Sequence, residues 1–357
     1  MNRERCGIRT EGLVAGSCAK PDAAWLGSND ERTLLRDAMM SSGIGKTASI
    51  YGFLGMAVLL VPCLLSGCTS LQTLSTGVDH EAEGAVLQID SQVLVRYWYE
   101  SVPYKPYVRE LYSPAGVNVV RDNVPDHLHH HALMYAVAVD GVNFWEEQQQ
   151  PGVQKNLGVG DVVVVGDTKV AGLKQKLDWI NPRTNEVLLK EQRKIWVRLI
   201  KSDGTTLLTW EAKLSVPAGK DSATLSGSHY FGLGMRFVQS MDAIGKFSNA
   251  DGKEGKIYRG EERLVDSDWC AYSAAVDGKP VTVAMFGHRS NPRYPTTWFT
   301  MAKPFAYMSA TLNLHAEPLK IPVGEPLDLR YAVAVWDGHV DSDAIESLYE
   351  KWGALSD

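Results

Sequence analysis

The residues Ile195-Trp196-Val197-Arg198-Leu199-Ile200 and Thr206-Leu207-Leu208-Thr209-Trp210-Glu211-Ala212-Lys213-Leu214, with Asp203-Gly204 between them, decide the fold class. Both runs are rich in β-branched and aromatic residues, which favour strands. Asp-Gly favours a tight turn, because glycine accepts the positive φ that such turns require. The segment therefore predicts a β-hairpin.

The same pattern recurs along the chain. Further strand-like runs are Leu94–Tyr99, Val162–Val165, Val281–Phe286 and Leu327–Val335, and further Asp-Gly turns are Asp140-Gly141, Asp277-Gly278 and Asp337-Gly338. Strands at short intervals, without helices alternating between them, predict an antiparallel β-sandwich or barrel. We therefore expect an all-β fold.

Helical patterns are scarce. Ser342-Asp343 could cap a helix over Ala344–Trp352 that ends at Gly353, and Phe237–Ile244 could form one turn of helix. No internal repeat or boundary interrupts the chain after His80. The sequence predicts one β-sandwich domain over residues 85–357, with one C-terminal helix.

The bulk composition excludes two classes of protein. The 357 residues carry a net charge of −6 and contain no run of lysine and arginine, so nucleic-acid binding is not expected. One apolar stretch in the whole chain is too few for a protein that crosses a membrane several times.

The N-terminal region predicts export. After Met39 and Lys46, an apolar run over residues 51–65 leads to Leu65-Ser66-Gly67-Cys68. A short apolar run, small residues and a cysteine are typical of a bacterial lipoprotein signal. Residues 39–67 are thus predicted as signal peptide, Cys68 as the lipidated residue and residues 68–84 as a tether. The alternative is an ordinary N-terminal membrane anchor.

This interpretation places the protein in the cell envelope, lipid-anchored in the outer membrane or at the periplasmic face. Residues 1–38 would then be explained by a start codon that was assigned too early, or they would form a disordered leader. Beyond Cys68 only Cys270 remains, so the mature domain can form neither an intramolecular disulfide nor a cysteine-rich zinc site.

The densest chemical signal is Asp126-His127-Leu128-His129-His130-His131, which leads into an apolar run. If residues 127–139 form one strand, His127, His129 and His131 share a face and His130 lies opposite. His127 and His129 could then hold a divalent metal, with Asp126, His229 or His288 as the third ligand. The alternatives are a polar substrate site without metal and a structural role.

Two further segments have the composition of pocket walls. The segment Ser228–Arg236 places glycines beside His229 and Arg236, and Phe286–Trp298 combines His288, Asn291 and Trp298 with prolines. Irregular loops of this composition are often functional. A surface crossover without function is the alternative for the second segment.

Several motifs together resemble the PmoA-like family of exported bacterial proteins, which is labelled methane oxygenase PmoA. The resemblance rests on Arg96-Tyr97-x-Tyr99-Glu100, Lys105-Pro106-Tyr107, Ser113-Pro114-Ala115-Gly116, the histidine run, Gly232-Leu233-Gly234-Met235-Arg236, Trp269-Cys270-Ala271-Tyr272-Ser273 and the residues 288–298. It spans about residues 85–338. His127, His129 and His130 match the family pattern, whereas Leu128, His131, Ala132, Ala271, Gly287, Arg289 and Phe299 depart from it.

The resemblance implies a large sandwich similar to the galactose-mutarotase-like supersandwich, whose members act on or bind carbohydrates. It implies a carbohydrate-active enzyme of hydrolase, lyase or isomerase type, acting on a carbohydrate or another small polar substrate. His127, His129, His130 and His288 would then be catalytic, and Arg236, Asn291, Trp298 and Tyr272 would bind substrate. A histidine-ligated metal-dependent oxidoreductase or lyase and a non-catalytic glycan-binding lipoprotein are the alternatives.

Overall fold

The hairpin that decides the fold class is present in the computed structural model, which describes residues 75–355. It consists of β10 (Glu186–Ile200) and β11 (Thr205–Ser215), joined by the 3-10 helix η1 (Lys201–Asp203). Gly204 closes the turn with a φ of 57°, which glycine adopts without steric cost. The hairpin prediction is confirmed.

Within the described residues the strands form three antiparallel sheets. The ten-stranded sheet has the order β1 (Gly77–His80), β2 (Gly84–Ile89), β3 (Gln92–Trp98), β4 (Tyr107–Leu111), β5 (Leu133–Ala136), β13 (Gly232–Arg236), β20 (Tyr307–Thr311), β19 (Thr296–Met301), β16 (Glu262–Ser267) and β15 (Lys256–Arg259). The eight-stranded sheet has the order β14 (Lys246–Asn249), β17 (Trp269–Val276), β18 (Lys279–Gly287), β22 (Leu327–Asp337), β11, β10, β9 (Val170–Asn181) and β8 (Val153–Val164). The four-stranded sheet has the order β21 (Leu319–Pro322), β12 (Ser222–Ser226), β6 (Ala138–Val139) and β7 (Val142–Asn143).

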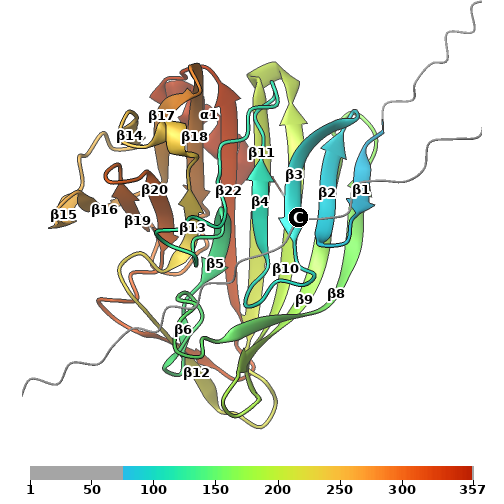
Figure 1. Cartoon of the computed structure of the whole chain (residues 1–357), viewed down its shortest axis with the longest axis vertical. Helices are drawn as coiled ribbons and strands as arrows, with labels where there is room; N and C mark the ends of the chain where they lie inside the picture. The colour runs from blue at the N-terminus through green and yellow to red at the C-terminus, as the bar shows by residue number, and fades with distance from the viewer. Residues whose placement is uncertain (1–74, 356–357) are drawn as a thin grey trace, which may run out of the picture. The chain divides into compact units, whose positions relative to one another are not determined.

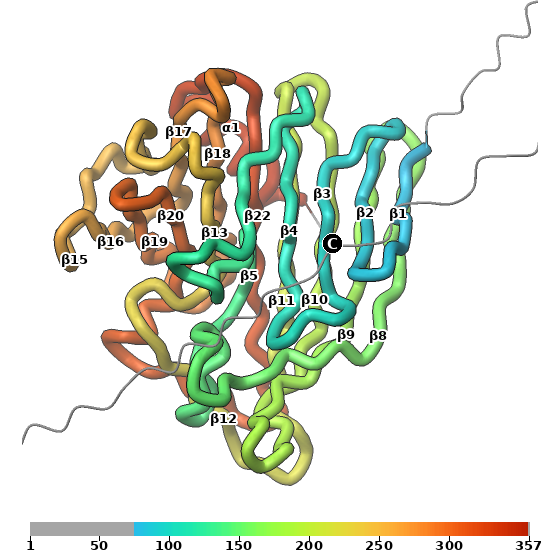
Figure 2. Tube along the Cα trace, in the orientation of Figure 1, coloured from blue at the N-terminus to red at the C-terminus, as the bar shows by residue number. Residues whose placement is uncertain are grey.

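The two large sheets pack face to face, with strands β1–β4 over strands β8–β11 (Figures 1 and 2). Aromatic pairs join the layers: Tyr97 of β3 meets Trp210 of β11, and Tyr135 of β5 meets Trp179 of β9. The main hydrophobic core lies between the sheets. The predicted antiparallel β-sandwich is confirmed.

The helix α1 (Ser342–Gly353) confirms the C-terminal prediction. Its N-cap is Asp341, one residue earlier than expected, whose carboxylate accepts the Ala344 N–H at 2.9 Å. Ile345, Leu348, Tyr349 and Trp352 are buried at the i, i+3, i+4 and i+7 spacing of one helix face. This face covers Trp269, Phe286 and Trp336 on the side of the eight-stranded sheet that faces away from the main core.

A charged pair lies inside the main core. Arg193 and Glu191, both on β10, are buried, and Arg193 Nε donates to Glu191 Oε1 at 2.7 Å. Trp179 Nε1 donates to Glu191 Oε2 at 2.8 Å, and Arg193 also donates to the Tyr97 hydroxyl at 3.0 Å. These bonds tie β9, β10 and β3 together across the sandwich.

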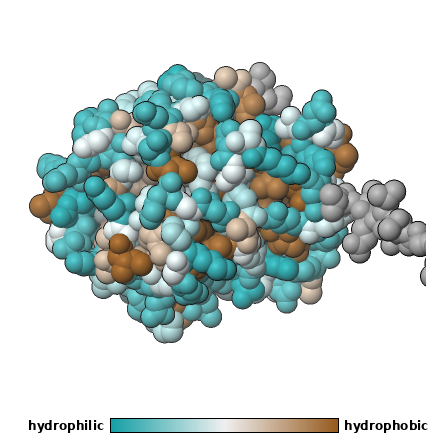
Figure 3. Space-filling view, turned by 90° about the horizontal axis from the view of Figure 1, so that it is seen from above, coloured by the Kyte–Doolittle hydropathy of each residue, from teal (hydrophilic) through white to brown (hydrophobic). Residues whose placement is uncertain are grey.

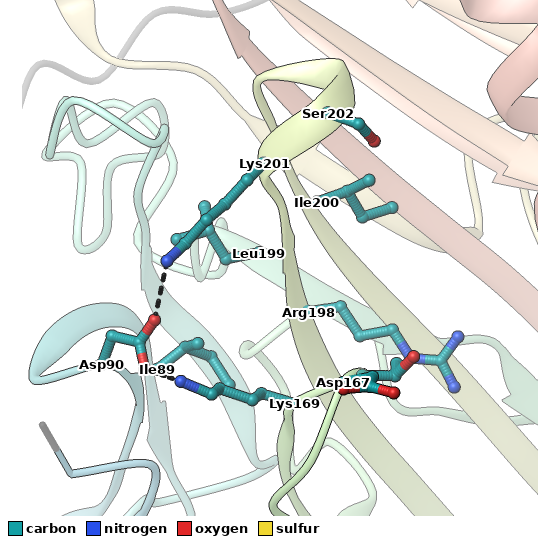
Figure 4. A pocket seen from close by; sticks show the side chains of 10 residues that line it. Ile89, Asp90, Asp167, Lys169, Arg198, Leu199, Ile200, Lys201 and Ser202 are labelled. Carbon is teal, nitrogen blue, oxygen red and sulfur yellow. Dashed lines mark hydrogen bonds and ion pairs between the residues drawn. The ribbon is translucent and has the colours of Figure 1, made fainter.

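At one end of the sandwich a single carboxylate connects the sheets. Asp90, in the turn between β2 and β3, accepts hydrogen bonds from Lys169 and Lys201 of the eight-stranded sheet's loops (Figure 4). The Lys201 Nζ lies 2.9 Å from Asp90 Oδ2. A hollow of about 300 Å³ adjoins this contact.

Three predictions need correction or stay open. The predicted tether 68–84 is wrong in its second half, because Gly77–His80 pairs with β2 as strand β1. The Asp337-Gly338 turn does not make a hairpin but leads from β22 towards α1. Residues 1–38, the signal peptide 39–67 and Cys68 lie outside the described residues.

The surface seen in Figure 3 is mostly hydrophilic, with hydrophobic residues scattered over it. Large hydrophobic side chains exposed elsewhere on the domain include Leu128, Val165 and Ile257. Of the helices that residues 75–355 form, none is long and apolar enough to cross a membrane.

Candidate functional site

The histidine run is a loop and not the start of a strand. The His127 N–H donates to the Val124 carbonyl and the His130 N–H donates to the His127 carbonyl, both at 2.9 Å. These turn hydrogen bonds replace a strand ladder, and β5 begins only at Leu133. The prediction that residues 127–139 form one strand, with His127, His129 and His131 on one face, is therefore wrong.

The loop instead gathers His127, His129 and His130, which we call the histidine cluster. The His127 and His130 rings stack with centroids 4.6 Å apart, and the His129 ring lies edge-on to His130 at 4.6 Å. His131 is not in this group. His127, His129 and His130, the three histidines that match the PmoA-like pattern, are thus the three whose rings come together.

The cluster lies against the face of the ten-stranded sheet that carries Arg236 and Tyr307, opposite to the face from which Tyr135 meets Trp179 of the other sheet. Its floor comes from β13 and β20, where Arg236 is paired directly with Tyr307. The His130 ring lies 4.8 Å from the Tyr307 ring, and the Arg236 guanidinium lies 3.6 Å from the centroid of Phe305. Gly234 leaves room for this floor, because a Cβ there would clash with Tyr307 and Trp145.

His130 is a neutral hydrogen-bond donor. Only 6% of the residue is exposed, and burial strongly lowers its pKa, with the charges of His129, His127 and Arg236 adding to the effect. Arg236 NH1 lies 3.2 Å from His130 Nδ1. Since a guanidinium can only donate, His130 Nδ1 accepts and the ring proton is on Nε2.

His129 and Glu146 form one side of the cluster. His129 Nε2 lies 3.4 Å from Glu146 Oε2, and the Tyr230 hydroxyl donates to Glu146 Oε1 at 3.2 Å. Glu146 is 31% exposed along its side chain. Burial lowers the pKa of His129, although the charge of Glu146 opposes this. A carboxylate and an imidazole in contact can pass a proton between them.

Asp126 lies on the more exposed side of the cluster, beside His127. Its Oδ2 lies 3.1 Å from His127 Nδ1 and 3.4 Å from Arg236 NH2. Burial raises the pKa of Asp126, but the hydrogen bond from His127 and the charge of Arg236 outweigh it, so the pKa is lowered. The ionised carboxylate offsets the charge of the buried guanidinium.

His131 belongs to a separate buried network. Its Nδ1 lies 2.8 Å from Asp122 Oδ1 and its Nε2 lies 2.8 Å from Glu147 Oε1. Lys105 also contacts Glu147 Oε1, at 2.5 Å. Burial lowers the pKa of His131, but the hydrogen bonds to the two carboxylates outweigh it and raise the pKa above 6.5. His131, one of the positions that depart from the PmoA-like pattern, thus connects the carboxylates of Asp122 and Glu147.

The His131 network predicts a pH-dependent stability. A pKa raised by folding means that the proton stabilises the fold below pH 6.5 and that this contribution is lost as the pH rises through the folded pKa. We expect the difference in unfolding free energy between wild type and His131→Gln to be largest near pH 6 and to shrink towards pH 9, by about 1.4 kcal/mol for each unit of raised pKa. Urea denaturation at several pH values measures it.

His315→Gln is the matched control, because burial lowers the pKa of His315. A lowered histidine pKa destabilises the fold at low pH and has no effect well above pH 6.5, so the slope should have the opposite sign. Equal slopes for the two variants would contradict the role assigned to His131.

His288 and Asn291 lie at a different place. His288 follows β18 and its ring contacts Trp352 of α1, with Nδ1 2.7 Å from Ser290 Oγ. Asn291 bonds to the backbone of Arg330, donating to its carbonyl and accepting its N–H, both at 2.8 Å. His288 lines a hollow of about 490 Å³ on the α1 side of the eight-stranded sheet. The expected pairing of His288 with the histidine cluster is therefore not formed.

Trp298 and Tyr272 are core residues. Both are 0% exposed, Trp298 Nε1 donates to the Ser267 carbonyl, and the Tyr272 hydroxyl donates to the Met241 carbonyl. A ring buried on both faces cannot stack on a sugar. The substrate-binding roles predicted for these two residues are corrected to packing roles.

His229 does not supply a third metal ligand. Its Nε2 lies 3.0 Å from Glu262 Oε2, and its ring stacks on Tyr258 with centroids 3.7 Å apart. Across residues 75–355, no three His, Cys, Asp or Glu side chains converge in a way that could hold a metal ion. The donor atoms of His127 and His129 face Asp126 and Glu146 instead, so the geometry does not favour a metal at His127 and His129.

Sequence reasoning missed Glu146, Tyr230 and Tyr307. Tyr230 and Tyr307 lie in or beside β13 and β20, and only the pairing of these strands brings them to the cluster. Glu146 lies in the segment Trp145-Glu146-Glu147. Two adjacent acids beside a buried aromatic residue were the available signal for it.

Comparison with known proteins adds a family and a distant fold likeness. Among solved structures the chain is similar to the alpha-galactosidase from Lactobacillus brevis, with 8% identity and a TM-score of 0.40. That alignment covers 77% of this chain and 41% of the other, so the chain spans less than half of that protein. A search of curated proteins found no significant match. The resemblance to the PmoA-like family stays a prediction.

Residues 84–350 match the model of one family. This range runs from the first residue of β2 into α1 and includes the histidine cluster, Glu146 and Arg236. The chain therefore belongs to the family described as "Family of unknown function (DUF6807)".

Proposed function

We propose that this protein is a carbohydrate-active enzyme that works by acid–base chemistry at the histidine cluster. The observation that carries the proposal is the contact between His129 and the partly exposed Glu146 carboxylate, with Tyr230 on the second oxygen of that carboxylate. Glu146 and His129 would exchange the proton with the substrate, as hydrolysis, elimination and isomerisation of sugars all require.

The other residues of the site would bind and orient the substrate. His130 offers a neutral N–H from its Nε2. Arg236 holds His130 in this tautomer and is itself balanced by Asp126. A fixed donor in a site of low water content can stabilise negative charge that develops on a sugar oxygen.

The charge balance favours an uncharged substrate. The two buried cations nearest the histidine cluster are already paired, Arg236 with Asp126 and Lys105 with Glu147. An anionic substrate would need a cation without such a partner. A neutral molecule with many hydroxyl groups instead matches a surface of imidazole, hydroxyl and carboxylate groups.

A screen of turnover tests the proposal. The purified full-length protein would be incubated with nitrophenyl glycosides, reducing oligosaccharides, uronate-containing oligomers and free aldoses and ketoses, and compared with His129→Gln. We expect at least one substrate to be converted by the wild type and not by the variant. Saccharide binding without any conversion would instead support the non-catalytic glycan-binding protein, and equal conversion by both proteins would refute the role of His129.

The location is a separate proposal. We infer from the predicted signal that the mature chain is lipid-anchored in the cell envelope through Cys68. Cys68→Ala is expected to abolish labelling by a radioactive or alkyne fatty acid and to move the protein out of the membrane fraction. Cys270→Ala is the matched control, because Cys270 is buried in β17. Unchanged labelling of Cys68→Ala would disprove the anchor.

A further inference from the structure

A run of three glutamines, Gln148-Gln149-Gln150, follows Glu146 closely and has no role in the site described above. The three side chains line a cleft of about 380 Å³ together with Asn143, Asn181 and Glu146. Glu146 therefore both contacts His129 and Tyr230 and lines this cleft, which we call the amide cleft.

The loop that carries the glutamines is held in place at both ends. Asn143 Oδ1 accepts the N–H groups of Trp145 and Glu146 at 2.8 Å and 3.1 Å, and the Gly152 N–H donates to the Asn143 carbonyl at 2.8 Å. Gly152 lies so close to the Phe144 ring that a Cβ at this position would clash with it. The position of Glu146 is thus fixed by the same asparagine that lines the cleft.

Arg183, in the turn between β9 and β10, braces the tip of the loop. Its Nε donates to Gln150 Oε1 at 3.1 Å and its NH2 donates to the Gln149 carbonyl at 3.3 Å. Gln149 and Gln150 have φ values of 58° and 60°, which residues with a side chain adopt at a cost. The two hydrogen bonds from Arg183 stabilise this backbone conformation, and they use the Nε and NH2 groups of its guanidinium.

The chemistry of the cleft suits hydroxyl groups. Each primary amide has an N–H₂ donor and a carbonyl acceptor, and five of the lining residues are Asn or Gln. A sugar hydroxyl also both donates and accepts. The lining also contains the Arg183 guanidinium and the Glu146 carboxylate, whose opposite charges give no net preference for an ion, and the amides can bind several hydroxyls of a neutral ring at once.

We propose that the amide cleft is a second sugar subsite, so that the substrate is an oligosaccharide that spans Glu146. This inference rests on the proposed function. One sugar unit would contact the histidine cluster, the next would bind the glutamines and Asn181, and Glu146 would lie at the junction between them. The substrate class is then a neutral glycan of two or more units and not a free monosaccharide.

The test compares substrates of different length. Kinetics would be measured with the nitrophenyl monoglycoside that the screen identifies and with the di-, tri- and tetrasaccharides of the same sugar, using wild type and Gln148→Ala/Gln149→Ala. We expect kcat/KM of the double variant to fall about tenfold on the oligosaccharides, as for a few lost hydrogen bonds, and to stay within about twofold on the monoglycoside. Gln192→Ala, an exposed glutamine on β10, is the matched control and should change neither value.

The same proteins separate a failure of this inference from a failure of the proposed function. An equal loss on all lengths, or no loss on any, overturns the subsite while turnover still stands. If nothing is converted, calorimetric titration with maltotetraose, cellotetraose, xylotetraose and chitotetraose decides. If a tetrasaccharide binds, and if Gln148→Ala/Gln149→Ala weakens this binding while Glu146→Gln does not, the result supports the subsite without catalysis. If none of the four tetrasaccharides binds, the subsite is overturned.

Discussion

The Glu146→Gln protein is expected to convert its substrate about 10²–10⁴-fold more slowly than the wild type, the usual contribution of a general acid or base. Glutamine keeps the shape of the side chain and can still accept the Tyr230 hydrogen bond that Glu146 accepts at 3.2 Å. It cannot take up or release a proton. The loss should therefore appear in kcat, measured at saturating substrate on protein whose circular dichroism is unchanged.

Two further variants sharpen this test. Tyr230→Phe removes the hydroxyl that donates to Glu146 but keeps the carboxylate, and it should reduce kcat much less than Glu146→Gln does. Glu325→Gln changes an exposed glutamate near β22 and should have no effect. Because burial lowers the pKa of His129, the acid limb of the kcat/KM profile should lie below pH 6.5. A Glu146→Gln protein with wild-type kcat would rule out acid–base chemistry at this carboxylate.

The second large effect is expected on stability. Glu191→Leu should lower the free energy of unfolding by about 3–5 kcal/mol, the typical result of breaking a buried ion pair from one side. The substitution leaves Arg193 in the core without the carboxylate that accepts from its Nε and NH2 at 2.7 Å and 2.9 Å. It also removes the partner of Trp179 Nε1. Urea denaturation followed by tryptophan fluorescence measures the change.

Two controls separate charge burial from loss of packing. Lys190 pairs with Asp178 at 3.1 Å on the exposed side of the same strand, and Lys190→Ala should cost less than about 1 kcal/mol. The double variant Glu191→Leu/Arg193→Met removes both charges and should recover most of the lost stability. A double variant that is less stable than the single one would show that Arg193 stabilises the fold through its other partners, Tyr97, Pro106 and Gln154.

Much of the fold could be predicted because its signals are local. Asp140-Gly141 and Asp277-Gly278 form turns with φ values of 49° and 80°, and 49° and 83°, as the dipeptide pattern indicates. Asp337-Gly338 is the same dipeptide, but the segment that follows it forms helix α1 instead of a strand. This outcome depends on the packing of the helix against Trp269 and Phe286. The sequence did not predict strand β1 because Gly77–His80 is short, and only the pairing of these residues with β2 shows that they form a strand.

The site could be predicted in composition but not in geometry. The density of histidines identified the loop, and Arg236 was correctly placed beside it. The grouping of His127, His129 and His130 depends on turn hydrogen bonds that the strand alternation could not reveal. Trp298 and His288 were expected at the site because their neighbours are polar, but Trp298 is buried where β19 pairs with β16, and His288 lies beside Trp352 of α1.

The position of α1 at the C-terminal side of every strand has a consequence for how the protein is made. During synthesis, the strands that carry Trp269, Phe286 and Trp336 leave the ribosome before residues 342–353. Until the helix arrives, this sheet face is an uncovered apolar surface, which chaperones and other chains can bind. The last described element of the chain thus also controls how long the nascent protein is prone to aggregate.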